Sequence, residues 1–213
     1  MRQRRVHMAM HYAIMVALAA ATMFLPAAGL ADGSASSPRA FVQQLTDESL
    51  GIIDRRDAGQ AGRTFAQNLD MPAFAQRCLA DHWATLTEEQ RAEFIDLFSR
   101  TLRAKMDEAL SKRVTGKAVR FAIGSPKRPD KEGIIEVPAD IFIDGNSVRL
   151  TYYLIKWAGG YRLVDYDAEG ALLSRNYRGQ FNYLIRNYGY AGMIERIRQK
   201  AEAQAARSQI SHS

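Results

Sequence analysis

Hydrophobic positions change their spacing along the chain and divide it into three blocks. In the first block, residues 38 to about 113, apolar residues lie three and four apart, the period of an amphipathic helix. In the second block, residues 119–166, apolar residues alternate with polar ones, as in half-buried strands. The third block, residues 172–206, returns to the helical period and is divided by Gly189. The pattern therefore predicts helices, then a sheet, then helices.

Local signals mark where the predicted helices begin. Pro38 fits the first turn of a helix, because its missing N–H would have no helical partner there. Asp70 is the predicted N-cap of a short helix that starts at Met71. The four residues from Thr87 to Gln90 form a capping box, in which the two end side chains bond each other's backbone N–H groups. This box predicts the start of the longest helix, which runs to about residue 113.

Four strands are predicted in the alternating block, paired as an antiparallel meander with one continuous apolar face. They cover residues 119–123, 135–143, 148–157 and 161–166. The sequence Asp144-Gly145-Asn146 is typical of a tight hairpin turn, because glycine tolerates the positive φ that such turns need. With helices before and after these strands, the predicted fold class is α+β, a four-stranded antiparallel sheet with helices packed on one face.

Two details of the predicted sheet follow from single residues. Pro138 cannot donate a hydrogen bond to a neighbouring strand, so its strand is expected at a sheet edge or with a bulge there. On the fourth strand, strict alternation places Tyr161 and Leu163 on one face. Val164 and Tyr166 are then expected on the opposite face.

The first residues of the chain have the composition of a secretory signal peptide. Three arginines within the first five residues precede an apolar run over residues 8–25. Small residues then lead to Ala31, after which cleavage is expected. A retained membrane anchor is the alternative, because the run approaches the ~20 residues that a membrane span needs. The predicted division is signal peptide 1–31, linker 32–37, one domain 38–206 and frayed tail 207–213.

Charge gives little indication of a binding partner. The chain has 29 Lys and Arg against 23 Asp and Glu, a net charge of +6. Removal of residues 1–31 takes away three arginines and no acid, which leaves 26 basic against 23 acidic residues. So mild an excess keeps a domain soluble without favouring nucleic acid, and no nucleic-acid partner is expected.

Cys78 is the one cysteine of the chain, so no intramolecular disulfide can form. It is a candidate nucleophile, because His82 follows four residues later along a predicted helix. The other interpretation is a small buried apolar residue. This interpretation is favoured, because no oxyanion-binding loop and no third orienting group accompany the pair in the sequence.

Three acidic residues, Asp165, Asp167 and Glu169, cluster after the last predicted strand. Carboxylates at a strand end can act as general acids or bind a hard cation. The alternative is a solvated loop in which an aspartate caps the next helix. The alternative is favoured, so no catalytic residue, metal or cofactor is predicted.

Three stretches of the mature chain carry a resemblance to a known family. They contain Phe74, Arg77, Leu79, Ala80, His82 and Trp83; then Leu86, Thr87, Gln90, Phe94 and Phe98; and finally Tyr161, Val164, Asp165, Glu169, Gly170, Leu173, Asn176, Tyr177, Arg178, Gln180 and Phe181. In this order the chain resembles the MlaC/toluene-tolerance family of periplasmic phospholipid-binding proteins, including its hopanoid-associated HpnM branch. Ala80 departs from the family pattern, which usually has glycine there, and Ala171-Leu172 replaces the usual Val-Ser.

The resemblance implies an α+β fold whose four-stranded sheet and helices enclose a deep apolar cavity. It implies a periplasmic carrier that holds the chains of a phospholipid, or of a related lipid such as a hopanoid, and ferries it between the two membranes. The bound lipid would be its ligand, with no cofactor. The implied protein partners are an inner-membrane ABC transporter complex and an outer-membrane lipoprotein complex.

An apolar chamber suits such a carrier, because each methylene exposed to water costs a lipid roughly 0.8 kcal/mol. The residues expected to line it are Phe94, Phe98, Leu102, Val137, Ala139, Ile141, Leu150, Tyr152, Leu154, Leu163, Leu173, Tyr177 and Phe181. The alternatives are an exported scaffold protein in which these side chains fill a solid core or, least favoured, a hydrolase that uses one of the two candidate catalytic groups.

Overall fold

The computed structural model describes residues 37–55, 64, 67–113, 117–158 and 160–210. The predicted signal peptide, and all of the predicted linker except Ser37, lie outside these residues. Part of the predicted tail, residues 211–213, also lies outside them.

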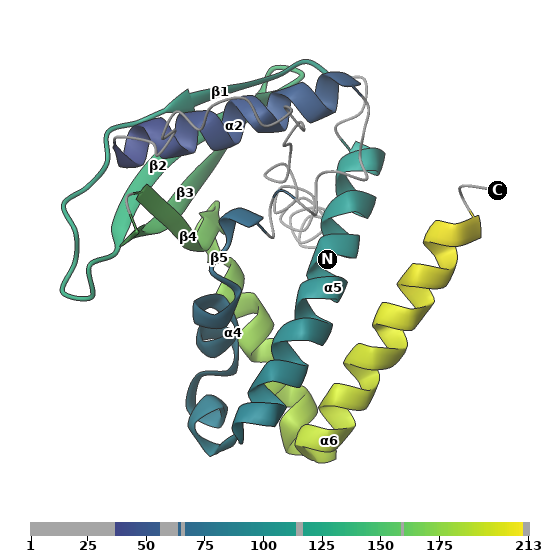
Figure 1. Ribbon diagram of the computed structural model, residues 1–213. Helices are drawn as coiled ribbons and strands as arrows, with labels where there is room; N and C mark the ends of the chain where they lie inside the picture. The colour runs from purple at the N-terminus through teal and green to yellow at the C-terminus, as the bar shows by residue number, and fades with distance from the viewer. Residues whose placement is uncertain (1–36, 56–63, 65–66, 114–116, 159, 211–213) are drawn as a thin grey trace, which may run out of the picture.

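Within the described residues, four α-helices and a short 3-10 helix accompany one antiparallel sheet (Figure 1). The helices are α2 (Pro38–Arg55), α4 (Met71–Leu79), the 3-10 helix η1 (Ala80–Thr85), α5 (Glu88–Arg113) and α6 (Leu173–Ile210). The strands are β1 (Val119–Ile123), β2 (Ile135–Ile143), β3 (Asn146–Trp157), β4 (Gly160–Ala168) and β5 (Ala171–Leu172). Neighbours in the sheet are neighbours in the sequence, in the order β1-β2-β3-β4-β5. The α+β class is confirmed, whereas the predicted count of four strands is wrong.

The helices begin at the predicted caps. Asp70 Oδ1 accepts a hydrogen bond from the backbone N–H of Ala73 (3.0 Å), in the first turn of α4. At the start of α5, the Thr87 N–H donates to Gln90 Oε1 (3.0 Å) and the Gln90 N–H donates to Thr87 Oγ1 (3.3 Å). Both bonds of the capping box are therefore present.

The fifth strand exists because β4 turns back on itself. Glu169 and Gly170 have φ of 53° and 81°, and Ala171 and Leu172 then pair with Ala168 and Asp167 of β4. The predicted hairpin between β2 and β3 has the same geometry, with φ of 49° at Asp144 and 82° at Gly145. Two consecutive residues with positive φ match the right-handed twist of the strands that they join. A strand of two residues is too short to show an alternating pattern.

A β-bulge at Val164 changes which side chains share a face. Tyr153 pairs with Asp165, but the next residue, Leu154, pairs with Leu163, so Val164 is the extra residue in β4. Leu163 and Tyr166 consequently lie on the same face of the sheet. The prediction that strict alternation separates these two residues was wrong, because it allows for no inserted residue.

Pro138 lies in an inner strand, not at an edge as predicted. It pairs with Thr151 of β3 in regular register, without a bulge. On its other side β1 has already ended at Ile123, and there the Pro138 carbonyl accepts from the Gly124 N–H (2.8 Å). A Cβ at Gly124 would lie 3.0 Å from Pro138 Cγ, so glycine allows this close approach. The missing N–H is tolerated because no strand continues opposite it.

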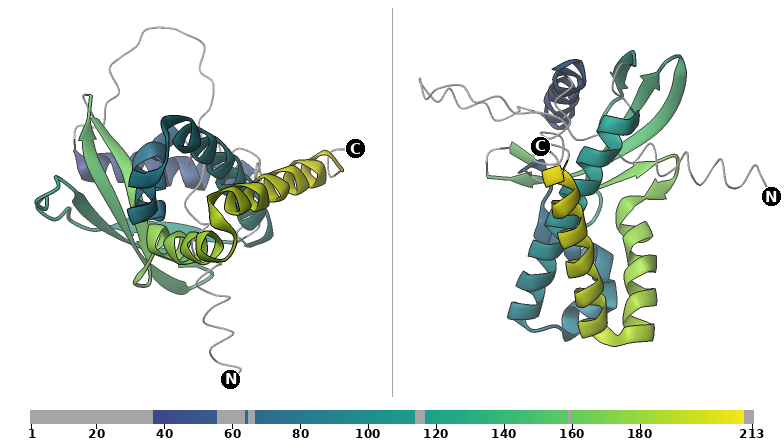
Figure 2. Two further views of the ribbon diagram at one scale, coloured as in Figure 1. Left: turned by 90° about the horizontal axis from the view of Figure 1, so that it is seen from below. Right: turned by 90° about the vertical axis from the view of Figure 1, so that its right-hand side faces the viewer.

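The helices form two groups around the sheet. Helix α2 lies across the strands, with contacts to β1, β2 and β4 (Figure 1). Helices α4, α5 and α6 pack on one another and extend away from the sheet, with α4 and α6 against β4 (Figure 2). Helix α6 consists of two arms that bend sharply at Gly189, whose φ is 67° and ψ is 175°. This confirms the predicted division of the last block.

Candidate functional site

The sheet presents one continuous apolar face. On β2 and β3, the buried side chains alternate with more exposed ones, and the register sets them opposite each other across the strands. The bulge brings Leu163 and Tyr166 of β4 onto the same face, opposite Leu154 and Tyr152. The buried side chains of this inner face are Ile135, Val137, Ala139, Ile141, Val148, Leu150, Tyr152, Leu154, Leu163, Tyr166 and Ala168.

Five aromatic rings form a cluster between the helices that extend from the sheet. Phe74 of α4 stacks on Phe98 of α5, with ring centroids 5.7 Å apart. Tyr177 and Phe181, one turn apart on α6, meet the Phe98 ring edge to face at 4.8 and 5.1 Å. Phe94 contacts Phe181 in the same manner at 5.2 Å. Such edge-to-face pairs add stabilisation beyond the burial of their surfaces.

The structure divides the predicted lining residues between these two regions. Seven lie on the inner face of the sheet, and six (Phe94, Phe98, Leu102, Leu173, Tyr177 and Phe181) lie on helices α5 and α6. All thirteen are buried. Their role in lining a chamber stays a prediction, because burial alone suits both a chamber and a filled core. Sequence reasoning missed Tyr166, which the bulge turns inward, and Phe74, whose helical spacing in α4 was the available signal.

Two tyrosines stand side by side on the inner face. Tyr152 and Tyr166 are paired across β3 and β4, and both side chains have no exposed surface. Burial raises the pKa of both hydroxyls, and the neighbouring Tyr177, Asp165 and Tyr152 raise the pKa of Tyr166 further. The Tyr152 hydroxyl has no hydrogen-bond partner in the described structure. An unpaired buried hydroxyl costs about 1–3 kcal/mol of folding free energy.

Lys105 brings a positive charge to the edge of the aromatic cluster. Its Nζ donates to the Tyr177 hydroxyl (3.3 Å) and lies 4.9 Å from the centroid of that ring. Burial, and secondly the nearby Lys200, lower the pKa of Lys105 to about 8. Near neutral pH this lysine is therefore mostly protonated and is attracted to the tyrosine ring.

A buried carboxylate joins β4 to the start of α6. Asp165 is 1% exposed, and its Oδ1 accepts from the backbone N–H groups of Tyr166 (2.9 Å) and Ser174 (3.2 Å). Burial raises the pKa of Asp165 to about 6, and the hydrogen bonds from Ser174 act in the opposite direction. The second oxygen, Oδ2, has no hydrogen-bond partner in the described structure.

The candidate nucleophile pair is not on one helix. Helix α4 ends at Leu79, where Ala80 (φ 48°, ψ −120°) turns the chain, and His82 lies in η1. Cys78 has no exposed surface, and burial raises the pKa of its thiol. A thiol attacks as thiolate, so this environment opposes nucleophilic chemistry.

The three acidic residues make separate structural hydrogen bonds. Asp167 Oδ1 accepts from the Gly170 N–H (2.8 Å), and Glu169 Oε1 accepts from the Arg149 N–H (2.6 Å). Asp165 caps the start of α6, as described above. These bonds support the interpretation in which the acids hold turns and cap a helix. Across the described ranges, no group of three or more His, Cys, Asp or Glu is placed to hold a metal ion.

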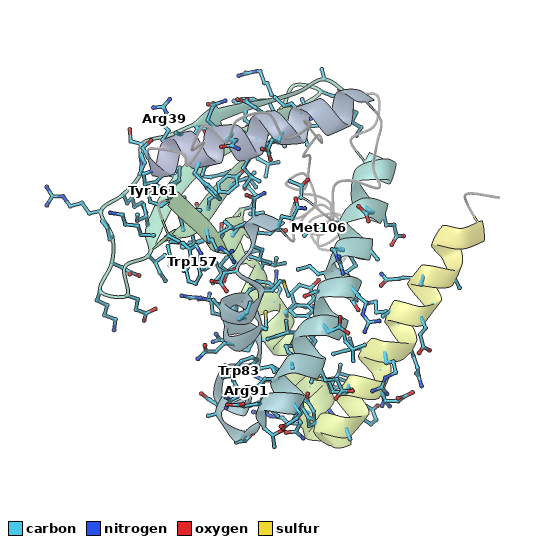
Figure 3. All side chains as sticks on the ribbon, viewed as in Figure 1. Arg39, Trp83, Arg91, Met106, Trp157 and Tyr161 are labelled. Atoms are coloured by element: carbon cyan, nitrogen blue, oxygen red, sulfur yellow. The ribbon has the colours of Figure 1, made fainter. Side chains whose placement is uncertain are left out.

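Aromatic residues with exposed or half-buried side chains mark other parts of the molecule. Trp157, at the end of the β3–β4 hairpin, is 50% exposed, and the Arg162 guanidinium lies 4.9 Å from its ring centroid. Figure 3 shows Trp157 and Tyr161 beside the sheet, and Trp83 with Arg91 at the far end of the helices. The Arg91 Nε donates to the Trp83 carbonyl (3.2 Å).

Within the described residues, none of the helices is long and apolar enough to cross a membrane.

Comparisons with known proteins give one family and one fold. The structure is similar to that of the phospholipid-binding protein from Ralstonia solanacearum, solved in complex with a phospholipid. The two chains are 20% identical with a TM-score of 0.69, and the likeness covers 80% of this chain and 99% of the other. No curated protein matches the sequence. The family model described as MlaC protein matches residues 41–199, from the first described helix into the second arm of α6. The chain belongs to the MlaC family.

Proposed function

We propose that this protein is a periplasmic lipid carrier. It holds the acyl chains of a phospholipid, or of a related membrane lipid such as a hopanoid, between the inner face of the sheet and the helices. It moves that lipid between the outer and inner membranes. The observation that carries the proposal is membership of the MlaC family, together with a shared fold in a protein that was solved with a phospholipid bound.

The apolar inner face gives the proposal its physical basis. Eleven buried side chains of three adjacent strands form it, and only its two tyrosines carry polar groups. A surface of this kind can take acyl chains out of water, which is worth roughly 0.8 kcal/mol per methylene. Ala139 of β2 and Ala168 of β4 lie on either side of Leu150 and are the smallest side chains at this level of the sheet, so the proposal places an alkyl chain over them.

The same arrangement argues against the enzyme alternatives. The thiol of Cys78 is buried, and the acids in and after β4 are used in turns and in a helix cap. A carrier needs shape and an apolar surface instead of a reactive group. We therefore assign no catalytic residue.

Lipid analysis of the purified protein tests the proposal. Protein purified from the envelope fraction without detergent is extracted with organic solvent, and the extract is analysed by mass spectrometry. A lipid at about one molecule per chain is expected. An extract without lipid, from protein that also fails to take up phospholipid from vesicles, would support the solid-core scaffold instead.

The transport steps are tested separately. Vesicles that contain a fluorescent phospholipid should lose it to lipid-free protein and pass it on to acceptor vesicles. The proposed partners, an inner-membrane ABC transporter complex and an outer-membrane lipoprotein complex, should be recovered by crosslinking in cells. N-terminal sequencing of exported protein should begin near Asp32, after the proposed cleavage at Ala31. Exported protein that still carries Met1 would contradict the proposed signal peptide.

A further inference from the structure

The hydroxyl of Tyr152 is a polar group without a function in the described fold. The side chain has no exposed surface, and its Oη has no hydrogen-bond partner in the part of the chain that the structure describes. Other tyrosines of the interior are used: Tyr177 accepts from Lys105, and Tyr190 donates to the Gln90 carbonyl (2.6 Å). Phenylalanine would supply the ring of Tyr152 without the cost of an unpaired hydroxyl.

The position of Tyr152 directs this hydroxyl toward the interior. Tyr152 is on β3, which lies between β2 and β4 in the sheet (Figure 1). Val137 of β2 is opposite it on one side and Tyr166 of β4 on the other. Leu150 and Leu154 flank it on the same face. A tyrosine ring carries its oxygen further from the strand than valine or leucine side chains reach. The hydroxyl oxygen therefore extends beyond the aliphatic side chains of Val137, Leu150 and Leu154 on this face.

We propose that Tyr152 Oη is the polar contact of the lipid site and donates a hydrogen bond to an ester carbonyl oxygen of a diacyl lipid. This inference rests on the proposed function. Ester carbonyls are the polar groups nearest to the acyl chains, and they only accept hydrogen bonds, so they need a donor. A buried tyrosine hydroxyl is such a donor, and burial keeps it protonated by raising its pKa. The ligand class is thus an ester-linked lipid, in preference to an ether-linked one.

The test compares two lipids and two variants. The probes are a diacyl phosphatidylglycerol and the dialkyl ether phosphatidylglycerol of the same chain length, bound to delipidated protein. The variants are Tyr152→Phe and Tyr153→Phe, which remove one hydroxyl each from opposite faces of β3. The wild type should bind the ester lipid about three- to tenfold more tightly than the ether lipid, the range expected for one net hydrogen bond. Tyr152→Phe should lose this preference through weaker binding of the ester lipid, whereas Tyr153→Phe should keep it.

The stability of the delipidated protein separates a binding role from a structural one. The melting temperature of delipidated Tyr152→Phe should equal or exceed that of the wild type, because no protein bond is lost. A clear decrease would overturn the inference, and so would an ester preference that Tyr152→Phe retains. Equal binding of both lipids by the wild type would overturn this inference and leave the proposed function intact. A wild type that binds neither lipid would overturn this inference together with the phospholipid form of the proposed function.

Discussion

Ala80 holds a backbone conformation that alanine rarely adopts. Its φ of 48° and ψ of −120° end α4 and begin η1. Conformations of this kind cost about 1–3 kcal/mol for residues with a Cβ, whereas glycine adopts them freely. The Ala80→Gly variant should therefore raise the free energy of unfolding by about 1 kcal/mol, after the larger backbone entropy of unfolded glycine is subtracted.

Denaturant unfolding of the wild type and two variants measures this effect. Ala84→Gly is the matched control, because Ala84 is an exposed residue of the same 3-10 helix and is not among the described residues with positive φ. The control should lose stability or leave it unchanged. A destabilised Ala80→Gly would show that the turn carries no strain.

Asp165 makes stability depend on pH. Its pKa is raised from 3.8 to about 6 in the folded protein, so the fold binds this proton more tightly than the unfolded chain does. Between pH 4 and 6 the Asp165 carboxyl is therefore mostly ionised in the unfolded chain but still mostly protonated in the folded protein. The contribution of this residue to stability is therefore greatest below pH 4 and is lost as pH rises to 6, by about 3 kcal/mol at most.

The Asp165→Asn variant should remove this part of the pH dependence. Asparagine retains a side-chain oxygen that accepts from Tyr166 and Ser174, and it does not ionise. Denaturation midpoints measured from pH 4 to 6 should decline less with rising pH than those of the wild type. The exposed Asp81→Asn is a control for the change in net charge. Equal slopes for Asp165→Asn and the wild type would contradict the assignment.

At the scale of elements, the bend of α6 depends on one glycine. Gly189 has a φ of 67° and a ψ of 175°, a conformation essentially limited to glycine, so Gly189→Ala should lower the free energy of unfolding by about 1–3 kcal/mol. Gly179 is an exposed residue of the first arm, with no atom within 4 Å of the position that a Cβ would occupy. Gly179→Ala should raise the free energy of unfolding by up to about 1 kcal/mol, because alanine favours helix.

The two glycine variants form a matched pair within one helix. Thermal unfolding followed by far-UV circular dichroism measures both, and their changes should have opposite signs. If Gly189→Ala left the free energy of unfolding unchanged, the bend between the two arms would not depend on the backbone conformation of this glycine. Arg198 of the second arm forms an ion pair with Glu93 of α5 (2.6 Å). A double-mutant cycle on Arg198 and Glu93 would measure whether this contact between the second arm and α5 is kept in each glycine variant.

Elements with strong local signals could be predicted from the sequence. The helix starts at Asp70 and Thr87, the turn at Asp144-Gly145 and the division of α6 at Gly189 all depend on residues next to the feature itself. The periods of 3.6 and 2 in the apolar pattern were sufficient to identify four of the five strands.

What could not be predicted depends on residues that are distant in the sequence or on single insertions. The bulge at Val164 shifts the alternation of β4 by one residue, which no periodic pattern contains. Pro138 is tolerated in an inner strand because β1 ends opposite it, a property of another strand. The division of the predicted lining residues between sheet and helices likewise depends on how α5 packs, which the apolar stripe of one helix does not specify.

At the scale of the whole molecule, Ala139 tests whether the interior is a chamber or a filled core. Ala139→Trp adds an indole to the inner face between β1 and β3. In a chamber, the delipidated variant should melt close to the wild type and should purify with much less lipid. In a filled core, the same change overpacks and costs ~1–3 kcal/mol or more.

We expect the result of a chamber, namely a nearly unchanged melting temperature and much less bound lipid. Differential scanning calorimetry measures the first and lipid extraction the second. Ala122→Trp is the control, because Ala122 is exposed on the neighbouring strand β1 and should change neither property. A strongly destabilised Ala139→Trp variant that still carries its full complement of lipid would contradict the chamber at this position.

The meander order of the sheet also sets a sequence of events in time. Every strand pairs with its neighbour in the chain, so the sheet can form from short loops, which close quickly. Helix α2, in contrast, depends on contacts between distant parts of the chain, because its Phe41 contacts Tyr161 on β4. The apolar stripe of α2, with Val42 and Leu45, therefore has no complete docking surface until β4 has emerged and paired. During synthesis, the earliest described helix is thus one whose contacts are completed late.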